Sequence, residues 1–499
     1  MPHPPFIILD ENFKAPLYRQ IYETIRRSIL SGEFHSGRQL PATRLLAKQL
    51  GISRLTVINA YDQLTAEGYL ESKSGAGTYV AEHLPEEFLQ TPLLKKSAGE
   101  TEFPPRKFNF SKYGKNVFKE SRRVLRYNGA TPLVAFQHGL AAIDEFPFDV
   151  WAKAVNKCYR AVERQTFGYG EPAGFLPLRE AIGAYLKSAR AVNCTPEQVI
   201  ITSGAQQAFD LIGRVFLEPK TKVLIENPCY FGVKQAFQSF DAEFVPVPVD
   251  KDGFDLAAVT NKQSHNARLV YVTPSHQFPL GVTMSLPRRL QLLEWARAAE
   301  AWIIEDDYDS EFRYEGRPLP SLQGLDRDPG RVLYIGTFSK TIFPALRLGC
   351  LVVPRDLIET FTAVRALSGS HSPLIDQATL AEFIAEGHFG RHIRRMRRLY
   401  EDRQQILVAE VKKQLADRLE VEKTVSGMHV IGWLPDGVKD SAVVEKAAQL
   451  GIRTATVSSL SLTGWQRGGL ILGYTAINEK QIKKGVKLLA KAIENLGRK

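Results

Sequence analysis

Cysteine is scarce in this 499-residue chain, and its four cysteines, Cys158, Cys194, Cys229 and Cys350, are far apart. No pair has the CxxC spacing of a redox or zinc site, which excludes a disulfide scaffold and a metal centre of that kind. No run of about eighteen apolar residues is present, which excludes a membrane-spanning helix. The N-terminus lacks the basic and apolar segments of a signal peptide. We therefore expect a cytoplasmic protein with free thiols, no bound metal and no membrane partner.

Length and charge indicate several domains and an anionic partner. At roughly 100–200 residues per domain, the chain has room for two or three domains. Lysine and arginine outnumber aspartate and glutamate by 65 to 54, a formal net charge of +11, which suits nucleic acid without establishing it. Residues 14–81 have helical periodicity and a strand-like end, residues 82–130 are rich in proline and basic residues, and residues 131–499 alternate apolar strand-like and helical segments. We interpret these regions as a small domain, a basic linker and an α/β domain.

The first region contains the pattern of a helix-turn-helix. Residues 43–50 predict a short helix that Gly51 can end, and Ser53 can cap a second helix over 54–67. In a helix-turn-helix the second helix enters the DNA major groove. Two strand-like segments around a glycine-rich turn follow and predict a hairpin wing. Periodicity alone is also compatible with a small helical domain that has a solvated polar face.

Three sequence runs of this region resemble the GntR-type winged-helix family: LPATRLLA at 40–47, LGISRLTV at 50–57 and AYDQLTAEG at 60–68. The resemblance covers nearly the whole first region and implies binding to double-stranded DNA. It implies DNA contacts from the two helices and the wing, at Arg44, Ser53, Arg54, Thr56 and Gly77. Arginine side chains suit phosphate or guanine contacts, so the basic members of this set fit that role.

Three motifs of the last region each follow an apolar, strand-like run. VIITSGAQQA at 199–208 contains a glycine turn before a helix, where backbone N–H groups can bind phosphate. AWIIEDDYDS at 301–310 has an acidic cluster at a strand end, the edge at which ligands bind in open α/β sheets. VLYIGTFSK at 332–340 ends in a lysine that Arg347 follows. Each motif alone is compatible with an ordinary turn, a solvated loop or an exposed lysine. Together they supply the phosphate cup, carboxylate, hydroxyl donor and lysine of a Schiff-base cofactor site.

The three motifs resemble the fold-type I aminotransferases, which depend on pyridoxal 5′-phosphate (PLP) and have a small C-terminal subdomain. Three runs behind a GntR-like region narrow the resemblance to the MocR/GabR-type regulators: TPSHQFP at 273–279, EDDYDSEFRY at 305–314 and TFSKT at 337–341. The likeness spans essentially the whole chain. It implies a transcription regulator with bound PLP, whose large domains form a head-to-tail homodimer.

The resemblance also implies a role for each matching site residue. Lys340 would form the Schiff base, Asp306 would face the pyridine nitrogen, and Tyr308 would donate to the ring hydroxyl. Tyr230 would stack on the ring, and Tyr169 would reach the phosphate of the partner subunit. The remaining residues would surround the phosphate: Ala205, Gln206, Thr337, Ser339 and Arg347.

The chain departs from the aminotransferase pattern at three places. Phe278-Pro-Leu-Gly281 stands where aminotransferases often have Asn-Pro-x-Gly, so the asparagine contact to the ring is missing or comes from His276 or Gln277. Residues 468–473 contain no arginine, although aminotransferases commonly carry a substrate-binding arginine there, and only Arg453 and Arg467 are nearby. Gly232 stands where GABA-responsive relatives have an arginine, which argues against GABA as the ligand.

We therefore predict a regulator whose PLP-bound domain senses an amino acid, another amine or PLP itself. The alternative is a working aminotransferase with an appended DNA-binding domain, and weak half-reactions are compatible with either function. DNA binding with a degenerate PLP site is a third hypothesis, which the intact Lys340, Asp306 and Arg347 disfavour. A basic helix is also predicted, facing either DNA or interface salt bridges, and contains Arg391, Arg394, Arg395, Arg397 and Arg398.

Overall fold

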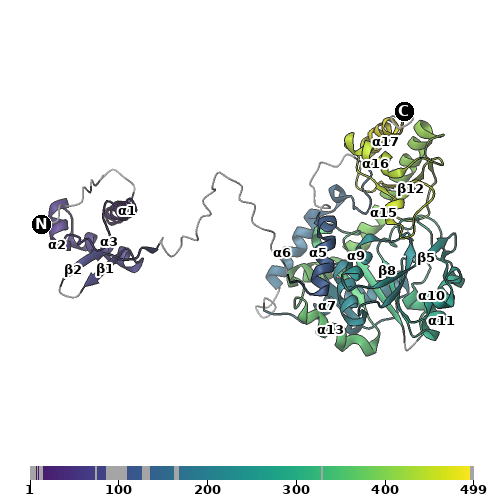
Figure 1. The fold of residues 1–499 in the computed structure, drawn as a ribbon, viewed down its shortest axis with the longest axis horizontal. Helices are drawn as coiled ribbons and strands as arrows, with labels where there is room; N and C mark the ends of the chain where they lie inside the picture. The colour runs from purple at the N-terminus through teal and green to yellow at the C-terminus, as the bar shows by residue number, and fades with distance from the viewer. Residues whose placement is uncertain are drawn as a thin grey trace. The chain divides into compact units, whose positions relative to one another are not determined.

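The structure, a computed structural model, describes residues 7, 9, 15–73, 76–85, 109–125, 135–161, 168–317, 319–327 and 330–494. The chain divides into two compact units, residues 1–108 and 109–499, each with its own hydrophobic core (Figure 1). Among the described residues, no helix is both long enough and apolar enough to cross a membrane.

The first unit is a three-helix domain with a two-stranded wing. Its elements are α1 (Leu17–Leu30), α2 (Thr43–Leu50), α3 (Arg54–Ala66), β1 (Leu70–Lys73) and β2 (Gly77–Val80). Gly51 ends α2 at φ 68°, a conformation that favours glycine, and the Ser53 hydroxyl accepts the backbone N–H of Thr56 at the start of α3. The apolar stripe of α1 packs against α3, so the core holds the helix-turn-helix in place. The predicted winged helix is confirmed.

The second unit is built on an eight-stranded sheet in the order β3-β10-β9-β8-β7-β4-β5-β6. Strands β9, β8, β7, β4 and β5 are parallel neighbours, whereas β10 and β6 run antiparallel to theirs. The strands are β3 (Val199–Thr202), β4 (Lys222–Asn227), β5 (Glu243–Asp250), β6 (Gly253–Phe254), β7 (Ala267–Val272), β8 (Trp302–Asp307), β9 (Val332–Thr337) and β10 (Gly349–Val352).

Helices cover both faces of this sheet, because its strands carry apolar side chains on both faces. Ile304 packs with Phe209 and Phe361 in one core cluster, and its neighbour Ile303 packs with Leu292 in another. The helices outside the small subdomain are α5 (Lys112–Leu125), α6 (Phe148–Ala161), α7 (Leu176–Arg190), α8 (Ala205–Phe216), α9 (Phe231–Ser239), α10 (Asn261–Ser264), α11 (Leu286–Ala298), α12 (Leu322–Leu325), α13 (Ile358–Leu367) and α14 (Leu374–Ala385). This layered α/β architecture is the predicted fold class.

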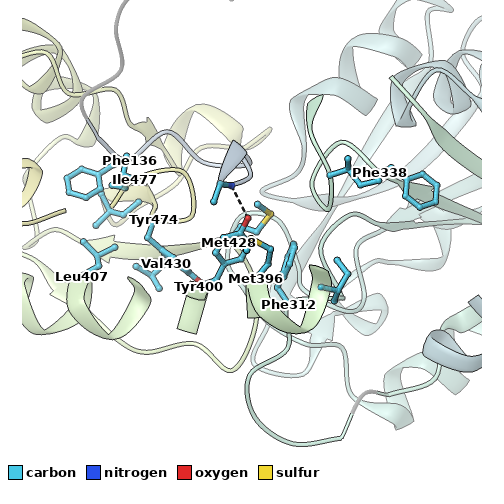
Figure 2. Close-up of a cluster of buried hydrophobic side chains, with 14 of the residues drawn as sticks. Phe136, Phe312, Phe338, Met396, Tyr400, Leu407, Met428, Val430, Tyr474 and Ile477 are labelled. Atoms are coloured by element: carbon cyan, nitrogen blue, oxygen red, sulfur yellow. Dashed lines mark hydrogen bonds between the residues drawn. The ribbon is translucent and has the colours of Figure 1, made fainter. Parts of the chain in front are cut away.

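A small C-terminal subdomain lies beyond the long helix α15 (His388–Leu415). Its sheet has the order β11-β12-β14-β13, and its elements are β11 (Glu420–Val421), β12 (His429–Trp433), α16 (Asp440–Gln449), β13 (Ala455–Thr456), β14 (Gly469–Gly473) and α17 (Glu479–Glu494). A buried cluster joins α15 and this sheet to the segment around Phe136 (Figure 2). In that cluster the Tyr400 hydroxyl accepts the backbone N–H of Ala142 at 2.9 Å. This hydrogen bond fixes the segment before Ala142.

Helix α5 lies within residues 82–130, which the sequence predicts as a linker. The structure differs from that prediction over residues 112–125 because tertiary contacts stabilise this basic helix. Lys112 Nζ pairs with the Asp241 carboxylate at 2.8 Å, and the ring of Tyr113 packs on Phe240 with centroids 5.4 Å apart. Residues 86–108 and 126–130 of the predicted linker lie outside the described residues.

Replacing Tyr400 by phenylalanine should lower the free energy of unfolding of the second unit. The substitution leaves the buried Ala142 N–H without its acceptor, a loss of about 1–3 kcal/mol. Urea unfolding, followed by circular dichroism, measures this difference. Tyr113→Phe is the matched control, because that ring is 44% exposed and should keep the wild-type midpoint. An unchanged midpoint for Tyr400→Phe would show that this hydrogen bond does not stabilise the unit.

Candidate functional site

A cavity of about 280 Å³ opens at the carboxyl ends of the parallel strands, close to the lower end of the roughly 300–1,000 Å³ of small-molecule sites. The ends of β7, β8 and β9 and the N-terminus of α8 form one side. Residues 137–140, with Met428 and His429 from the small subdomain, form the other. The site therefore lies where the large sheet meets the small subdomain.

One end of the cavity is built to hold an anion. Gly204 precedes α8 at φ 87°, so the backbone N–H groups of Ala205 and Gln206 are at the free N-terminus of a helix. Arg347 donates to the Ser203 carbonyl at 2.6 Å, and a Cβ added at Gly204 would lie 3.4 Å from the Arg347 guanidinium. Helix N–H groups and a guanidinium together suit a phosphate dianion.

Two hydroxyl residues complete this end of the cavity. Thr337 ends β9, and its hydroxyl accepts the backbone N–H of Ser339 at 3.3 Å. The Ser339 hydroxyl is buried and, within the described part of the chain, has no hydrogen-bond partner. Because a buried polar atom without a partner is costly, this orphan hydroxyl fits a bound phosphate oxygen.

Asp306 is the carboxylate of the acidic cluster that faces the cavity. Side chains alternate along a strand, so Glu305 and Asp307 of β8 point to the other face of the sheet. Asp306 Oδ2 accepts the Tyr271 hydroxyl at 2.8 Å. Burial raises the pKa of Asp306 to about 7, against the hydrogen bond from Tyr271. Asp306 Oδ1 has no partner among the described residues, and a protonated ring nitrogen would supply one.

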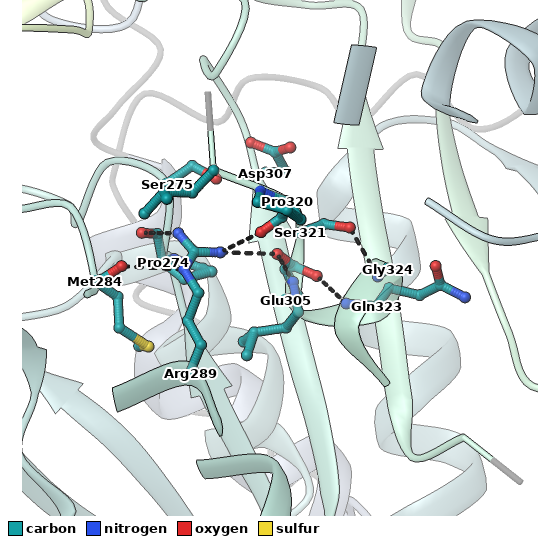
Figure 3. Close-up of polar contacts among 12 residues, drawn as sticks. Pro274, Ser275, Met284, Arg289, Glu305, Asp307, Pro320, Ser321, Gln323 and Gly324 are labelled. Carbon is teal, nitrogen blue, oxygen red and sulfur yellow. Dashed lines mark hydrogen bonds and ion pairs between the residues drawn. The ribbon is translucent and has the colours of Figure 1, made fainter. Parts of the chain in front are cut away.

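Two buried arginines hold the neighbouring carboxylates. Arg190 Nε donates to Asp307 at 2.7 Å. The Arg289 guanidinium lies 4.0 Å from Glu305 and donates to the Pro274 and Pro320 carbonyls at 2.7 and 3.0 Å (Figure 3). These contacts neutralise the far face of β8 and tie its end to the loop after β7.

Lys340 extends across the cavity floor from the loop after β9. Its Nζ donates to the Gly139 carbonyl at 2.8 Å. Burial lowers the pKa of Lys340 below its ordinary value, while the Asp309 and Asp306 carboxylates act in the opposite direction. A lowered pKa increases the neutral fraction of the amine, which is the form that attacks a carbonyl carbon.

Tyr308 lines the cavity and is positioned by a buried histidine. His276 Nδ1 lies 2.9 Å from the Tyr308 hydroxyl and 3.0 Å from Asp309 Oδ2. His276 and Gln277 are absent from the cavity lining, among the residues the structure describes, whereas Phe278 belongs to it. His276 therefore acts through Tyr308. The apolar ring of Phe278 occupies the position at which aminotransferases often have an asparagine.

The two remaining tyrosines of the predicted site occupy different surroundings. Tyr230 lines the cavity and is 39% exposed, with its ring 5.9 Å from that of Phe278. Tyr169 is 97% exposed and its ring meets His371, outside the cavity lining. A single chain therefore brings together all the predicted cofactor residues except Tyr169.

Sequence reasoning missed several lining residues: Gln137, His138, Tyr271, Met428 and His429. Tyr271 lies near the end of an apolar strand, and its position beside a strand-end carboxylate could have suggested it. The other four come from segments separated by nearly the whole second unit, which carry no local motif. Only the packing of the small subdomain against the large sheet brings them to one cavity.

Neither arginine proposed as a carboxylate anchor lines the cavity in the described structure. Arg467 donates to the Leu434 carbonyl, pairs with Glu420 and lies over the Trp433 ring. Arg453 lies close enough to lower the pKa of His138, but it is outside the lining. On the strand that lacks the arginine, Ile471 packs with Phe278 in an apolar cluster.

The predicted DNA-contacting residues gather at the start of α2, the start of α3 and the wing. Arg44, Ser53, Arg54 and Gly77 are exposed and Thr56 is half-buried. The Arg54 guanidinium contacts the Thr43 hydroxyl at 3.4 Å, so the N-termini of α2 and α3 are adjacent. Gly77 has φ 114°, and residues 74 and 75 of the wing lie outside the described residues.

The predicted basic helix is part of α15. Four of its arginines are exposed, whereas Arg397 is half-buried and donates to the Glu311 carbonyl at 2.8 and 3.0 Å. Within the described ranges, no carboxylate of this chain forms an ion pair with any of the five: Arg391, Arg394, Arg395, Arg397 and Arg398. The helix therefore presents a basic surface.

Both units match known protein families. The family of bacterial regulatory proteins called gntR matches residues 17–80, and aminotransferase class I and II matches residues 139–471. A relative from Rhizobium meliloti, named "probable rhizopine catabolism regulatory protein MocR", is 39% identical over 97% of this chain and 95% of its own. The HTH-type pyridoxine biosynthesis transcriptional regulator PdxR of Corynebacterium glutamicum is 30% identical over 96% of each chain.

Solved structures match the second unit. The α-aminoadipate aminotransferase LysN from Thermus thermophilus, complexed with N-(5′-phosphopyridoxyl)-L-leucine, is 28% identical with a TM-score of 0.70. It covers 78% of this chain and 97% of its own. The kynurenine aminotransferase of Pyrococcus horikoshii, in complex with PMP, is 28% identical with a TM-score of 0.69, over 76% of this chain and 95% of its own.

Fold and site together define a class of proteins in which a DNA-binding winged helix is joined to a domain of aminotransferase fold. Within that class, the chain belongs to the MocR/GabR-type regulators. The family match confirms pyridoxal 5′-phosphate as the predicted cofactor. The orphaned oxygens of Asp306 and Ser339, which belong to different strand-end motifs, fit the ring nitrogen and the phosphate of that group.

Proposed function

We propose that this chain is a transcription regulator that binds an operator in double-stranded DNA and senses an amino compound, or PLP itself, through its second unit. One observation carries the proposal: a single chain joins a winged helix with exposed polar residues to a cavity. That cavity holds a half-buried lysine, a carboxylate with an unpaired oxygen and a helix N-terminus suited to an anion. PLP, when bound, supplies a carbonyl that condenses with amines and a ring that withdraws electrons.

The residues that hold the ring of PLP come from four strand ends. Lys340 Nζ would form the covalent link, since it lines the cavity and its lowered pKa increases the fraction of neutral amine. Asp306 Oδ1 pairs with the ring nitrogen, and the Tyr271 hydroxyl orients that carboxylate. Tyr308 donates to the ring hydroxyl while His276 holds it in place. Tyr230 stacks on the ring.

The phosphate of PLP is held by charge and by helix N–H groups. Ala205 and Gln206 donate their backbone N–H groups, and Thr337, Ser339 and Arg347 add two hydroxyls and a guanidinium. Tyr169, whose side chain is 97% exposed, extends from one subunit to the phosphate of its partner in a head-to-tail homodimer. Such a dimer would also pair two winged helices in the cytoplasm, for two operator half-sites.

Sensing requires that ligand binding and DNA binding share one conformational equilibrium. The proposal requires that the second unit has two conformations, which hold the winged helices differently. A ligand that favours one conformation must then change the affinity for the operator. An aminotransferase with an appended DNA-binding domain is the second candidate, favoured by the intact set around Lys340. The absence of an arginine from the cavity wall beside β14, within the described residues, disfavours efficient turnover of amino acids.

Lys340→Ala should abolish covalent capture of PLP. Borohydride reduction followed by peptide mass analysis should find the reduced adduct on Lys340 in the wild type and on no peptide of the variant. Lys262→Ala, at an exposed lysine, is the control and should keep the adduct. A reduced adduct on another lysine of the Lys340→Ala variant would place the cofactor elsewhere.

Tyr271→Phe should weaken PLP binding about tenfold. A hydrogen bond to a charged group contributes about 1.5–3 kcal/mol, and about 1.4 kcal/mol corresponds to a factor of ten. Fluorescence titration of the apoprotein with PLP measures the dissociation constant. Tyr334→Phe is the control, because Tyr334 donates to Asp307 at 2.7 Å on the other face of β8 and should keep PLP affinity. Equal affinity in Tyr271→Phe would exclude a role of this hydroxyl in binding.

Arg54→Ala should weaken operator binding roughly tenfold to a hundredfold, because one arginine–base or arginine–phosphate contact contributes about 1–3 kcal/mol. A fragment selected from random-sequence DNA, titrated at fixed salt, provides the measurement. The visible spectrum of bound PLP should not change. Arg214→Ala, at an exposed arginine of the second unit, is the matched control. Unchanged DNA affinity of Arg54→Ala would contradict the assignment of α3 as the recognition helix.

A further inference from the structure

Part of the cavity lining is not assigned to PLP, and this part forms a wall without charged side chains. Its lining residues come from the segment before α6, the loop after β7 and the start of β12: Gln137, His138, Leu140, Phe278, Met428 and His429. Of all lining residues that the structure describes, the cationic ones are Lys340 and Arg347. Both are assigned to the proposed cofactor site. Arg453, whose charge adds to burial and to Lys340 in lowering the pKa of His138, is outside the described lining.

The two histidines of this wall are neutral. His429 Nε2 lies 2.8 Å from the Pro279 carbonyl, and because a carbonyl only accepts, Nε2 carries the proton. Burial lowers the pKa of His429 well below its ordinary value, and burial also lowers the pKa of His138 to about 4. At neutral pH His429 Nδ1 is therefore a hydrogen-bond acceptor.

A second acceptor of the wall has no partner. The Gln137 side-chain oxygen is buried and makes no hydrogen bond in the part of the chain that is described. Such an atom calls for a donor, which a hydroxyl or an amide N–H of a ligand can provide. A carboxylate has no hydrogen to donate, and its negative charge would face two acceptors.

The strand that carries a carboxylate anchor in aminotransferases is apolar in this chain. Ile471 of β14 packs with Phe278, Ile431 and Val457. Arg467 is held by Glu420 and the Trp433 ring. A buried carboxylate without a cation is strongly disfavoured, so this wall discriminates against amino acids.

We propose that the effector is a primary amine whose remaining part carries hydroxyl or other uncharged donor groups and no carboxylate. This inference rests on the proposed function and narrows its ligand class. Amino alcohols represent the class. The amine approaches Lys340, and its donor groups pair with Gln137 Oε1 and His429 Nδ1.

Matched ligand pairs test the proposal on the full-length, PLP-loaded protein. 4-Amino-1-butanol is compared with 4-aminobutanoate, and 2-amino-1,3-propanediol with serine, by calorimetric titration and by the absorption of bound PLP. In each pair the amino alcohol should bind at least tenfold more tightly. Equal or tighter binding of the amino acid overturns the proposal, and so does a lack of response to both amino alcohols.

Two variants identify the groups responsible. Gln137→Met, which removes the acceptor oxygen, should weaken binding of 4-amino-1-butanol about tenfold and leave binding of butylamine, which has no hydroxyl, unchanged. Arg453→Met should leave both ligand preferences unchanged, because Arg453 is outside the cavity lining. A preference for amino acids that Arg453→Met removes would identify Arg453 as a carboxylate anchor and reject the proposal.

Failure of this inference is distinguishable from failure of the proposed function. A response of PLP absorption and operator affinity to amino acids alone, or to PLP alone, would reject an amine without a carboxylate as the effector and keep the proposed regulator. Loss of the proposed function would instead appear as covalent PLP on a lysine other than Lys340, or as operator binding that no small molecule alters.

Discussion

The alternation of side chains along the end of β8 is the constraint on which the site depends. Glu305, Asp306 and Asp307 are adjacent in sequence, but the strand sends the middle one to the cavity and the outer two to the opposite face. Three like charges so close together would repel one another strongly in a buried place. Arg190 and Arg289 pair with the outer two, and this leaves Asp306 alone beside the cavity, with one oxygen held by Tyr271.

The remaining parts of the site are arranged around that carboxylate by the sheet. Parallel strands end at the same edge, so Tyr271, Asp306 and Thr337 meet there although they are far apart in the chain. The helix α8 lies on the Asp306 face of the sheet and directs its N-terminus to the same edge. Met428 and His429 of the small subdomain line the cavity together with residues 137–140. Tyr400 holds the latter segment at Ala142, and its Gly139 carbonyl accepts the Lys340 amine.

Catalysis by an aminotransferase and ligand sensing by a regulator place different requirements on the residues that contact the ligand. Chemistry on amino acids needs a cation that grips the carboxylate, whereas a sensor needs only a ligand that distinguishes two arrangements of the protein. This chain has the half-buried lysine and the helix N-terminus suited to an anion, and its wall beside β14 is apolar with neutral imidazoles. The cavity of this chain therefore suits the binding of an amine, and apolar packing occupies the place of a cationic grip on a carboxylate.

The sequence by itself determined the two-part organisation, the winged helix and those cavity-lining residues that lie in strand–turn motifs, such as Asp306 and Lys340. Those features are local: a helix cap at Ser53, a glycine turn at Gly204 and an apolar strand before each polar cluster. The folding of α5 within a basic, proline-flanked segment was decided by its contacts with Asp241 and Phe240. The tertiary structure also decided which histidines line the cavity, because His138 and His429 meet only when the small subdomain packs on the sheet. It decided their charge as well, since burial, not residue type, keeps these rings neutral, and in His429 it does so against the hydrogen bond to the Pro279 carbonyl.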